Sequence, residues 1–145
     1  MIRQMTADTL PCAARLACAL WSNHTAADME AELTALLHDE GAAIYLASDG
    51  SMPIGYAQCQ LRCDYVEGTS TSPVSYLEGI YVAESYRRQG VARSLLSTCR
   101  SWAKTQGCTE FASDCELTNT ESLAFHLRLG FTEANRIICF TQTIE

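Results

Sequence analysis

The residues best suited to binding an anion form the run Arg87-Arg88-Gln89-Gly90-Val91-Ala92, which stands between a predicted strand and a predicted helix. Backbone N–H groups at the start of a helix point outward, and the helix dipole favours a negative group there. Gly90 permits close approach of a ligand to the backbone, and Ala92 is too small to block it. We therefore predict a cradle for a pyrophosphate. Arg93 adds a third arginine to this cluster, for which a solvated helix end is the alternative interpretation.

This loop differs from the common nucleotide-binding motifs. No Lys-Ser/Thr pair follows the glycine, as a Walker A motif requires, and the pattern is not GxGxxG. Arg-x-x-Gly-x-Ala instead resembles the Q/R-x-x-G-x-G/A signature of the GNAT superfamily of N-acetyltransferases. The resemblance implies that acetyl-coenzyme A is the cosubstrate and that residues 87–93 bind its pyrophosphate.

Further features of that superfamily follow in the expected order. The resemblance implies that Asn119 contacts the pantetheine arm, and His126 stands where many members carry a tyrosine. His126 precedes Leu129-Gly130-Phe131, an ending typical of the superfamily. The longer matches to aminoglycoside 6'-N-acetyltransferases are Leu20-Trp21-Ser22, Tyr65-Val66-Glu67-Gly68, Ser72-Pro73-Val74, 77–82 and 110–114. They imply transfer of an acetyl group to the 6'-amino group of an aminoglycoside antibiotic, which gives antibiotic resistance.

An acceptor amine has to lose a proton before it can attack a thioester. An alkylamine has a pKa near 10.4, so exposing its lone pair at pH 7 costs about 4 kcal/mol. The resemblance places Glu78 and Asp114 in the acceptor pocket as candidate bases, and we favour Asp114, directly or through water. An edge-exposed or arginine-paired strand residue is the alternative for Glu78, and a helix cap or turn former is the alternative for Asp114.

The remaining acceptor-site candidates are aromatic or polar. Trp21, His24 and Tyr65 would present ring faces to sugar rings and cations, although core packing is the alternative for Trp21 and a surface position the alternative for His24. Related enzymes carry an acidic substrate contact from the neighbouring subunit where this chain has Asn135. The resemblance therefore also implies a homodimer with an altered range of acceptors.

The resemblance also suggests how the thioester is activated. A backbone N–H of Ile80, Tyr81 or Val82 would polarise the acetyl carbonyl, although an ordinary strand hydrogen bond is equally compatible with the sequence. His126 could protonate the leaving thiolate, water could do so, or the thiolate could leave unassisted, since a thiol pKa near 8.5 makes it a tolerable leaving group.

Hydrophobic periodicity and turn residues predict the elements that position these groups. We expect strands at 2–5, 43–47, 54–61, 74–82, 110–113 and 136–143, and helices at 8–20, 25–41, 91–107 and 119–129. Thr25 and Asp28 resemble a capping box at the start of the second helix. The polar segment 64–72 should be a loop.

These elements predict an α/β or α+β protein whose strand-helix-strand steps are parallel. The GNAT resemblance implies a mixed, mostly antiparallel sheet with a splayed parallel strand pair and about four flanking helices. With 145 residues we expect a single N-acetyltransferase domain over 1–145.

Composition limits the possible partners. The formal charge of −7 disfavours nucleic acid and suits a polycationic amine. No apolar run is long enough for a membrane span, and the charged residues Asp8 and Arg15 argue against a signal peptide at 10–21. The eight cysteines are scattered without a CxxC pair, so we expect free thiols, a cytoplasmic location and no metal.

Two alternative functions remain open from the sequence. The chain could acetylate another amine, such as a polyamine or a protein N-terminus, or it could sense acetyl-coenzyme A without turnover. A ping-pong route through a cysteine is disfavoured, because no cysteine has a recognisable activating partner.

Overall fold

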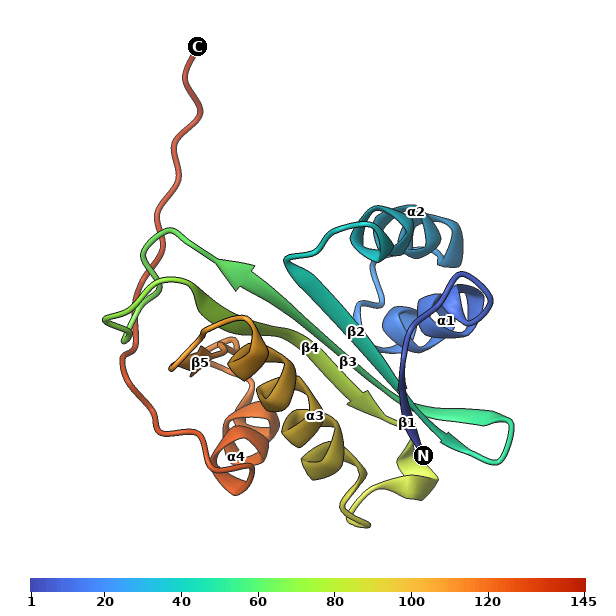
Figure 1. Cartoon of the computed structure of the whole chain (residues 1–145). Coiled ribbons are helices and arrows are strands. Elements are labelled where there is room, and N and C mark those ends of the chain that lie inside the picture. Colours follow the sequence, from blue (N-terminus) through green and yellow to red (C-terminus); the bar gives the residue numbers. More distant parts are fainter. The chain divides into compact units, whose positions relative to one another are not determined.

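Five strands form one sheet in the order β1-β2-β3-β4-β5 in the computed structural model, which describes residues 1–145 (Figure 1). The strands are β1 (Ile2–Gln4), β2 (Ala42–Asp49), β3 (Met52–Arg62), β4 (Val74–Val82) and β5 (Phe111–Ala112). The helices are α1 (Leu10–Leu20), α2 (Ala26–Leu37), the short 3-10 helix η1 (Glu84–Tyr86), α3 (Val91–Thr105) and α4 (Thr120–Arg128).

Pairing is antiparallel from β1 to β4 and parallel between β4 and β5. The mixed sheet and its helices confirm the predicted fold class, and the parallel β4-α3-β5 step is confirmed. Only two residue pairs join β4 to β5, Ser75 with Phe111 and Tyr76 with Ala112. The second half of β4 therefore extends beyond its pairing with β5, which is the splay that the family resemblance implied.

Alternating side chains on the strands give the sheet two apolar faces. Ile44, Leu46 and Tyr56 pack against α1 and α2 on one face. Ala43, Ala57 and Cys59 pack against α3 on the other face, as Figure 1 shows for the helices. Because period-2 alternation sends neighbouring residues to opposite faces, the two cores share the same strands.

The first helix belongs to the core. Its buried residues are Leu10, Ala13, Ala14 and Ala17, and Cys18 and Trp21 are partly buried against the same cluster. This confirms the helix face predicted for this segment. The helix begins at Leu10 rather than at residue 8, after the turn in which Thr9 Oγ1 accepts a hydrogen bond from Thr6 N at 2.9 Å. No helix of the chain combines the length and apolar character that a membrane crossing needs.

Contacts group the chain into two compact units, Met1–Ser113 and Asp114–Glu145. The first unit holds the sheet with α1, α2 and α3, and the second holds α4 and the C-terminal segment. The single domain over 1–145 stays a prediction.

The predicted strand at 136–143 is wrong for the isolated chain, because residues 131–145 form neither helix nor strand. Ile138 and Phe140 in this segment are 78% and 87% exposed. An alternating pattern shows only that a segment can pair, and a strand also needs a neighbour for its backbone groups.

Candidate functional site

The predicted phosphate loop is a sharp turn at the start of α3. Gly90 caps the helix with a φ of 84°, and Arg88 also has a positive φ, 61°. The first hydrogen bond of the helix runs from Ser94 N to Gly90 O at 3.0 Å, so the amides of the first turn have no partner within the helix. A Cβ built at Gly90 meets nothing within 4 Å, so the space above the turn is open.

The start of α3 differs from the starts of two other helices. In α2 Thr25 Oγ1 accepts from Asp28 N and Asp28 Oδ2 accepts from Thr25 N, both at 3.1 Å, which confirms the predicted capping box. In α4 Asn119 Oδ1 accepts from Ser122 N at 3.0 Å. By contrast, α3 has no side-chain cap and no acidic residue in its first turn. Its amides are therefore available to an external anion, and a pyrophosphate fits that requirement.

Two predicted phosphate ligands also hold the loop in place. Arg87 Nε donates to Val82 O at 2.8 Å, and Gln89 Nε2 donates to Ser85 O at 3.1 Å. The loop is thereby fixed to the end of β4. Tyr86 OH donates to Asp49 Oδ2 at 3.0 Å, which fixes η1 to the β2-β3 hairpin.

A β-bulge positions Glu78. Gln58 pairs with Gly79 and the next residue, Cys59, pairs with Leu77, so Glu78 is the extra residue on β4. A bulge interrupts the alternation of side chains and redirects one of them. It directs Glu78 to Arg62 at the end of β3.

Arg62 and Glu78 form a bidentate ion pair. Arg62 Nε and Nη2 donate to Glu78 Oε1 at 3.1 and 3.0 Å, and Nη2 also donates to Oε2 at 2.9 Å. The Arg62 guanidinium carbon lies 3.5 Å from the centre of the Tyr76 ring. The arginine-paired alternative for Glu78 is therefore what the structure shows, and it engages both carboxylate oxygens.

Trp21 lies against β4 beside Glu78. A Cβ built at Gly79 would fall 2.7 Å from two atoms of the Trp21 ring, so the indole touches the strand backbone there. Trp21 also packs edge-on against Tyr56 with ring centres 6.2 Å apart. The structure thus brings together Trp21 and Glu78, two residues that the sequence assigned to the acceptor site.

A row of hydrogen-bonded side chains runs along β3 on the face that carries Tyr56. Tyr56 OH donates to Gln58 Oε1, and Gln58 Nε2 donates to Gln60 Oε1 at 2.8 Å. Burial is the main cause that raises the pKa of Tyr56 above its ordinary value, so the phenol remains a donor. Buried polar groups of this kind need partners, and the row supplies them.

His24 and Tyr65 are exposed, and each lies in a loop of the first unit. His24 follows Trp21 in the turn closed by the bond from His24 N to Trp21 O at 3.1 Å. Tyr65 is 78% exposed, while its neighbour Val66 packs with Val74 and Tyr76. The loop at 64–72 is confirmed, and Val66 docks it on the start of β4.

Ile80, Tyr81 and Val82 occupy the part of β4 beyond the pairing with β5. They pair with Ala57, Tyr56 and Gly55 of β3, which leaves their other edge without a strand from β5. A strand is splayed where it separates from its neighbour, and this part of β4 is not paired with β5. Which N–H polarises an acetyl carbonyl stays a prediction.

The second unit holds Asp114, Asn119, His126 and Asn135. Asp114 is exposed and directly follows the residue after β5. Asn119 uses its side-chain oxygen as the α4 cap, so its side-chain N–H groups are the atoms that could reach a pantetheine amide. Asn135 lies in the exposed C-terminal segment.

His126 makes a hydrogen bond that fixes its tautomer. Its Nδ1 lies 2.7 Å from Ser122 O, and a carbonyl can only accept, so Nδ1 carries the hydrogen. In the neutral ring Nε2 is therefore an acceptor, and only an imidazolium could donate from it. The ring packs edge-on with Phe125 and Phe131, at centre distances of 6.1 and 5.3 Å.

Sequence reasoning missed several residues of this site. Arg62 and Tyr76 shape the surroundings of Glu78, and Glu110 holds the Tyr65 loop by accepting from Ser70 N and Thr71 N at 2.9 and 2.8 Å. The polar residues at alternate positions 58, 60 and 62 were the available signal, because alternation places them on one face of a strand.

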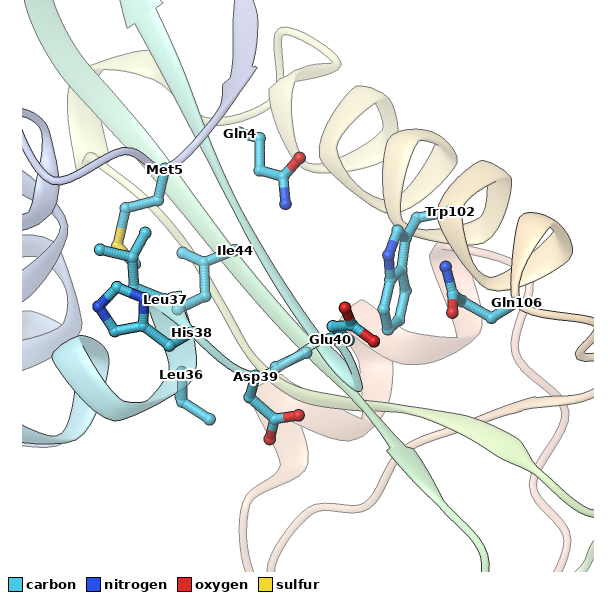
Figure 2. A pocket seen from close by; sticks show the side chains of 11 residues that line it. Gln4, Met5, Leu36, Leu37, His38, Asp39, Glu40, Ile44, Trp102 and Gln106 are labelled. Carbon is cyan, nitrogen blue, oxygen red and sulfur yellow. The ribbon is translucent and has the colours of Figure 1, made fainter.

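One open cavity of about 450 Å³ lies elsewhere (Figure 2). Its lining comes from β1, β2 and the C-terminal ends of α2 and α3, and includes Met5, Ile44 and Trp102. None of the predicted site residues lines it. The structure brings together no group of three or more His, Cys, Asp or Glu side chains that could hold a metal ion.

Known proteins resemble this chain over nearly its whole length. The acetyltransferase (GNAT) family model matches residues 8–131. An aminoglycoside N(6')-acetyltransferase type 1 from Serratia marcescens is 40% identical over 139 residues, which cover 94% of each chain. The apo crystal structure of an aminoglycoside 6'-N-acetyltransferase from Acinetobacter haemolyticus superposes with a TM-score of 0.96 at 39% identity, covering 100% of this chain and 99% of that one.

A third relative was solved with a ligand. AAC(6')-Iy, in complex with the bisubstrate analogue CoA-S-monomethyl-acetylneamine, has a TM-score of 0.94 and 36% identity, with 99% of this chain and 98% of that chain covered. The TM-scores show that these enzymes share the fold described above. The chain belongs to the acetyltransferase (GNAT) family.

Proposed function

We propose that this protein transfers the acetyl group of acetyl-coenzyme A to the 6'-amino group of an aminoglycoside antibiotic, and thereby gives resistance. The observation that carries this proposal is near-complete coverage, at about 40% identity, by relatives named for that reaction. The open, uncapped start of α3 supports the coenzyme A half of the reaction. The Glu78 carboxylate, with the Trp21 ring against the neighbouring Gly79 and the Tyr76 ring covered by Arg62, supports the aminoglycoside half.

Coenzyme A would bind along the elements that follow β4. Residues 87–93 would hold its pyrophosphate through the first-turn amides of α3, and the Asn119 side chain would donate to the pantetheine arm. An N–H of Ile80, Tyr81 or Val82 would donate to the acetyl oxygen as it becomes negative, an interaction worth about 3 kcal/mol in other enzymes.

We assign the role of base to Asp114 and a binding role to Glu78. Both oxygens of Glu78 accept hydrogen bonds from Arg62, which suits a fixed binding group. Asp114 is exposed to solvent near the end of β5, which suits proton transfer directly or through water. Asp114 would take a proton from the acceptor amine, whose lone pair attacks the thioester carbonyl. The tetrahedral intermediate then expels the thiolate of coenzyme A. No covalent enzyme intermediate is needed in this direct route.

The acceptor would lie against the predicted acceptor-site residues of the first unit. Trp21 beside Gly79, His24 in the following turn and Tyr65 would contact the aminoglycoside. A formal charge of −7 attracts a polycation at long range, more strongly at low salt.

We also propose that the protein is a cytoplasmic homodimer. Support comes from the C-terminal segment, whose strand-like pattern is unpaired in one chain and whose Ile137, Ile138, Phe140 and Ile144 are 62–94% exposed. Pairing with a second copy would cover them and would bring Asn135 toward the partner's acceptor site. All eight cysteines are free, which suits a reducing compartment.

Thiol release from acetyl-coenzyme A tests the function. We expect release with kanamycin and tobramycin, and little with spermidine or a peptide, with mass spectrometry locating the acetyl group at N6'. Asp114→Asn should lower kcat by about 10²-fold to 10⁴-fold while calorimetry shows coenzyme A binding retained. Binding without any turnover would support a sensor, and turnover of spermidine or the peptide alone would support another acceptor class.

A further inference from the structure

We propose that Arg62 is an internal substitute for the charged acceptor, which occupies Glu78 and the face of Tyr76 until an aminoglycoside displaces it. This inference rests on the proposed function and adds a residue that sets acceptor affinity. Arg62 lies at the end of β3 and acts through Glu78 and Tyr76.

The contacts of Arg62 reproduce those an aminosugar requires. Its guanidinium donates three hydrogen bonds to the Glu78 carboxylate and stacks 3.5 Å from the centre of the Tyr76 ring. A protonated amine on a sugar likewise needs a carboxylate for its charge and an aromatic face for its C–H groups. Tyr76 is only 7% exposed, so its face becomes available only when Arg62 moves.

The burial of the pair allows such an exchange. The side chains of Arg62 and Glu78 are 44% and 21% exposed, so the arginine can swing into water while the carboxylate stays at its bulge. A long, half-exposed arginine loses little when such a pair opens, because water solvates the released guanidinium.

The place of the pair on the sheet supports an acceptor role. Glu78 directly precedes Gly79, whose backbone touches the Trp21 ring, so both lie beside a predicted acceptor contact. Val66, next to Tyr65, belongs to the same buried cluster as Tyr76. An incoming aminosugar that contacts Trp21 or Tyr65 would thus meet Arg62 nearby.

Steady-state kinetics of Arg62→Gln test the displacement. We expect the KM for kanamycin to fall roughly twofold to fivefold, the range that an exposed ion pair contributes, with the KM for acetyl-coenzyme A unchanged. Arg62→Lys keeps the charge but loses the bidentate, stacked geometry, so its kanamycin KM should fall between those of Arg62→Gln and the unmodified protein. Arg100→Gln removes the same charge from an exposed position of α3 and should change neither KM.

Two further variants distinguish displacement from a general loosening of the fold. In the Glu78→Gln background, Arg62→Gln should give no gain in affinity, because the freed carboxylate is missing. If Arg62→Gln unfolds, as thermal unfolding would show, Arg62→Met replaces the arginine with an unbranched apolar side chain that can still cover Tyr76, and it carries the same expectation. An unchanged or raised kanamycin KM in the folded variant overturns the inference.

Calorimetry with kanamycin alone separates this inference from the proposed function. If the unmodified protein releases no thiol with any aminoglycoside, the proposed function fails. The affinity for kanamycin, measured by calorimetry, then decides whether Arg62 acts as an internal substitute. Tighter kanamycin binding by Arg62→Gln supports displacement in that case too. Equal, weaker or no binding overturns it.

Discussion

Gly79 has no side chain, and this allows Trp21, a predicted acceptor contact, to pack against the backbone of β4. A Cβ there would fall 2.5 Å from Leu20 Cδ2 and 2.7 Å from two Trp21 ring atoms, closer than side chains tolerate. We predict that Gly79→Ala pushes Trp21 away from β4, raises the acceptor KM at least about fivefold and costs about 1–3 kcal/mol of stability.

Gly41→Ala is the matched control for this change. Its Cβ would meet the flexible Asp39 carboxylate at 3.2 Å, so stability should change by less than about 1 kcal/mol and the acceptor KM should stay the same. Chemical denaturation and kinetics measure both effects. An unchanged acceptor KM for Gly79→Ala would show that Trp21 does not contact the acceptor.

The tautomer of His126 predicts a minor part in thiolate release. Because Nδ1 donates to Ser122 O, the neutral ring has no hydrogen on Nε2 to give. We expect His126→Phe, which keeps an aromatic ring between Phe125 and Phe131, to retain kcat within about threefold. A loss of more than about a hundredfold in pre-steady-state transfer would instead identify His126 as the acid.

At the level of elements, the start of α3 is where charge should control coenzyme A binding. Gln89→Glu keeps the side-chain shape, adds a negative charge beside the proposed pyrophosphate site and loses the hydrogen bond from Nε2 to Ser85 O. We predict a KM for acetyl-coenzyme A that rises about threefold to tenfold, an unchanged acceptor KM and a slightly lower melting temperature. Ser97→Glu places the same charge on an exposed site further along α3 and should leave both KM values unchanged.

The loop that carries Tyr65 depends on Glu110. Hydrogen bonds from the Thr71 hydroxyl and from the Ser70 and Thr71 amides lower the pKa of Glu110 below its ordinary value of 4.5. A lowered pKa in the folded state stabilises the protein above pH 4.5, and this contribution disappears as pH falls below 4.5 through the folded-state pKa. The loop should therefore loosen only in acid.

Glu110→Gln tests this dependence. We predict that the variant is less stable than the unmodified protein at pH 6–7 and that the difference shrinks below pH 4.5, as measured by chemical denaturation across that range. Glu30→Gln, at an exposed position of α2, is the control and should show no such convergence. A constant difference across the range would mean that Glu110 acts through packing and not through charge.

The boundaries of the helices and strands show which features of the fold depend only on residues close together in the sequence. The strand at 74–82 and the capping box at Thr25 and Asp28 were predictable, because apolar alternation and cap chemistry act between near neighbours. The bulge at Glu78 was not, because it depends on how β3 and β4 pair. The strand at 136–143 failed for the same reason, since no strand of the chain supplies its partner.

At the scale of the whole molecule, the C-terminal segment determines the expected assembly. We predict that light scattering finds a dimer and that Ile138→Asp with Phe140→Asp gives a folded monomer, because two charges would oppose burial of this segment. Met52→Asp changes another exposed apolar residue, 59% exposed in the β2-β3 hairpin, and should leave the dimer intact. A monomeric unmodified protein would refute the dimer.

The sequence by itself determined the order of strands and helices as far as α4, the glycine-centred turn before α3 and the family. These features depend on residues that are near neighbours along the chain: the glycine-centred turn before α3, the alternation within each strand and the spacing of apolar residues within each helix. The roles of Asp114, Asn119 and His126 came from the family resemblance and stay predictions.

The tertiary structure alone decided the surroundings of Glu78. Arg62 and Glu78 are 16 positions apart, and their contact requires both the register of β3 with β4 and a bulge that turns one side chain toward the other. The missing side-chain cap of α3 is notable only by comparison with α2 and α4, whose first turns each have a side-chain cap. Long-range pairing fixes such contacts because hydrogen bonds between strands, and not local preferences, determine which residues face each other.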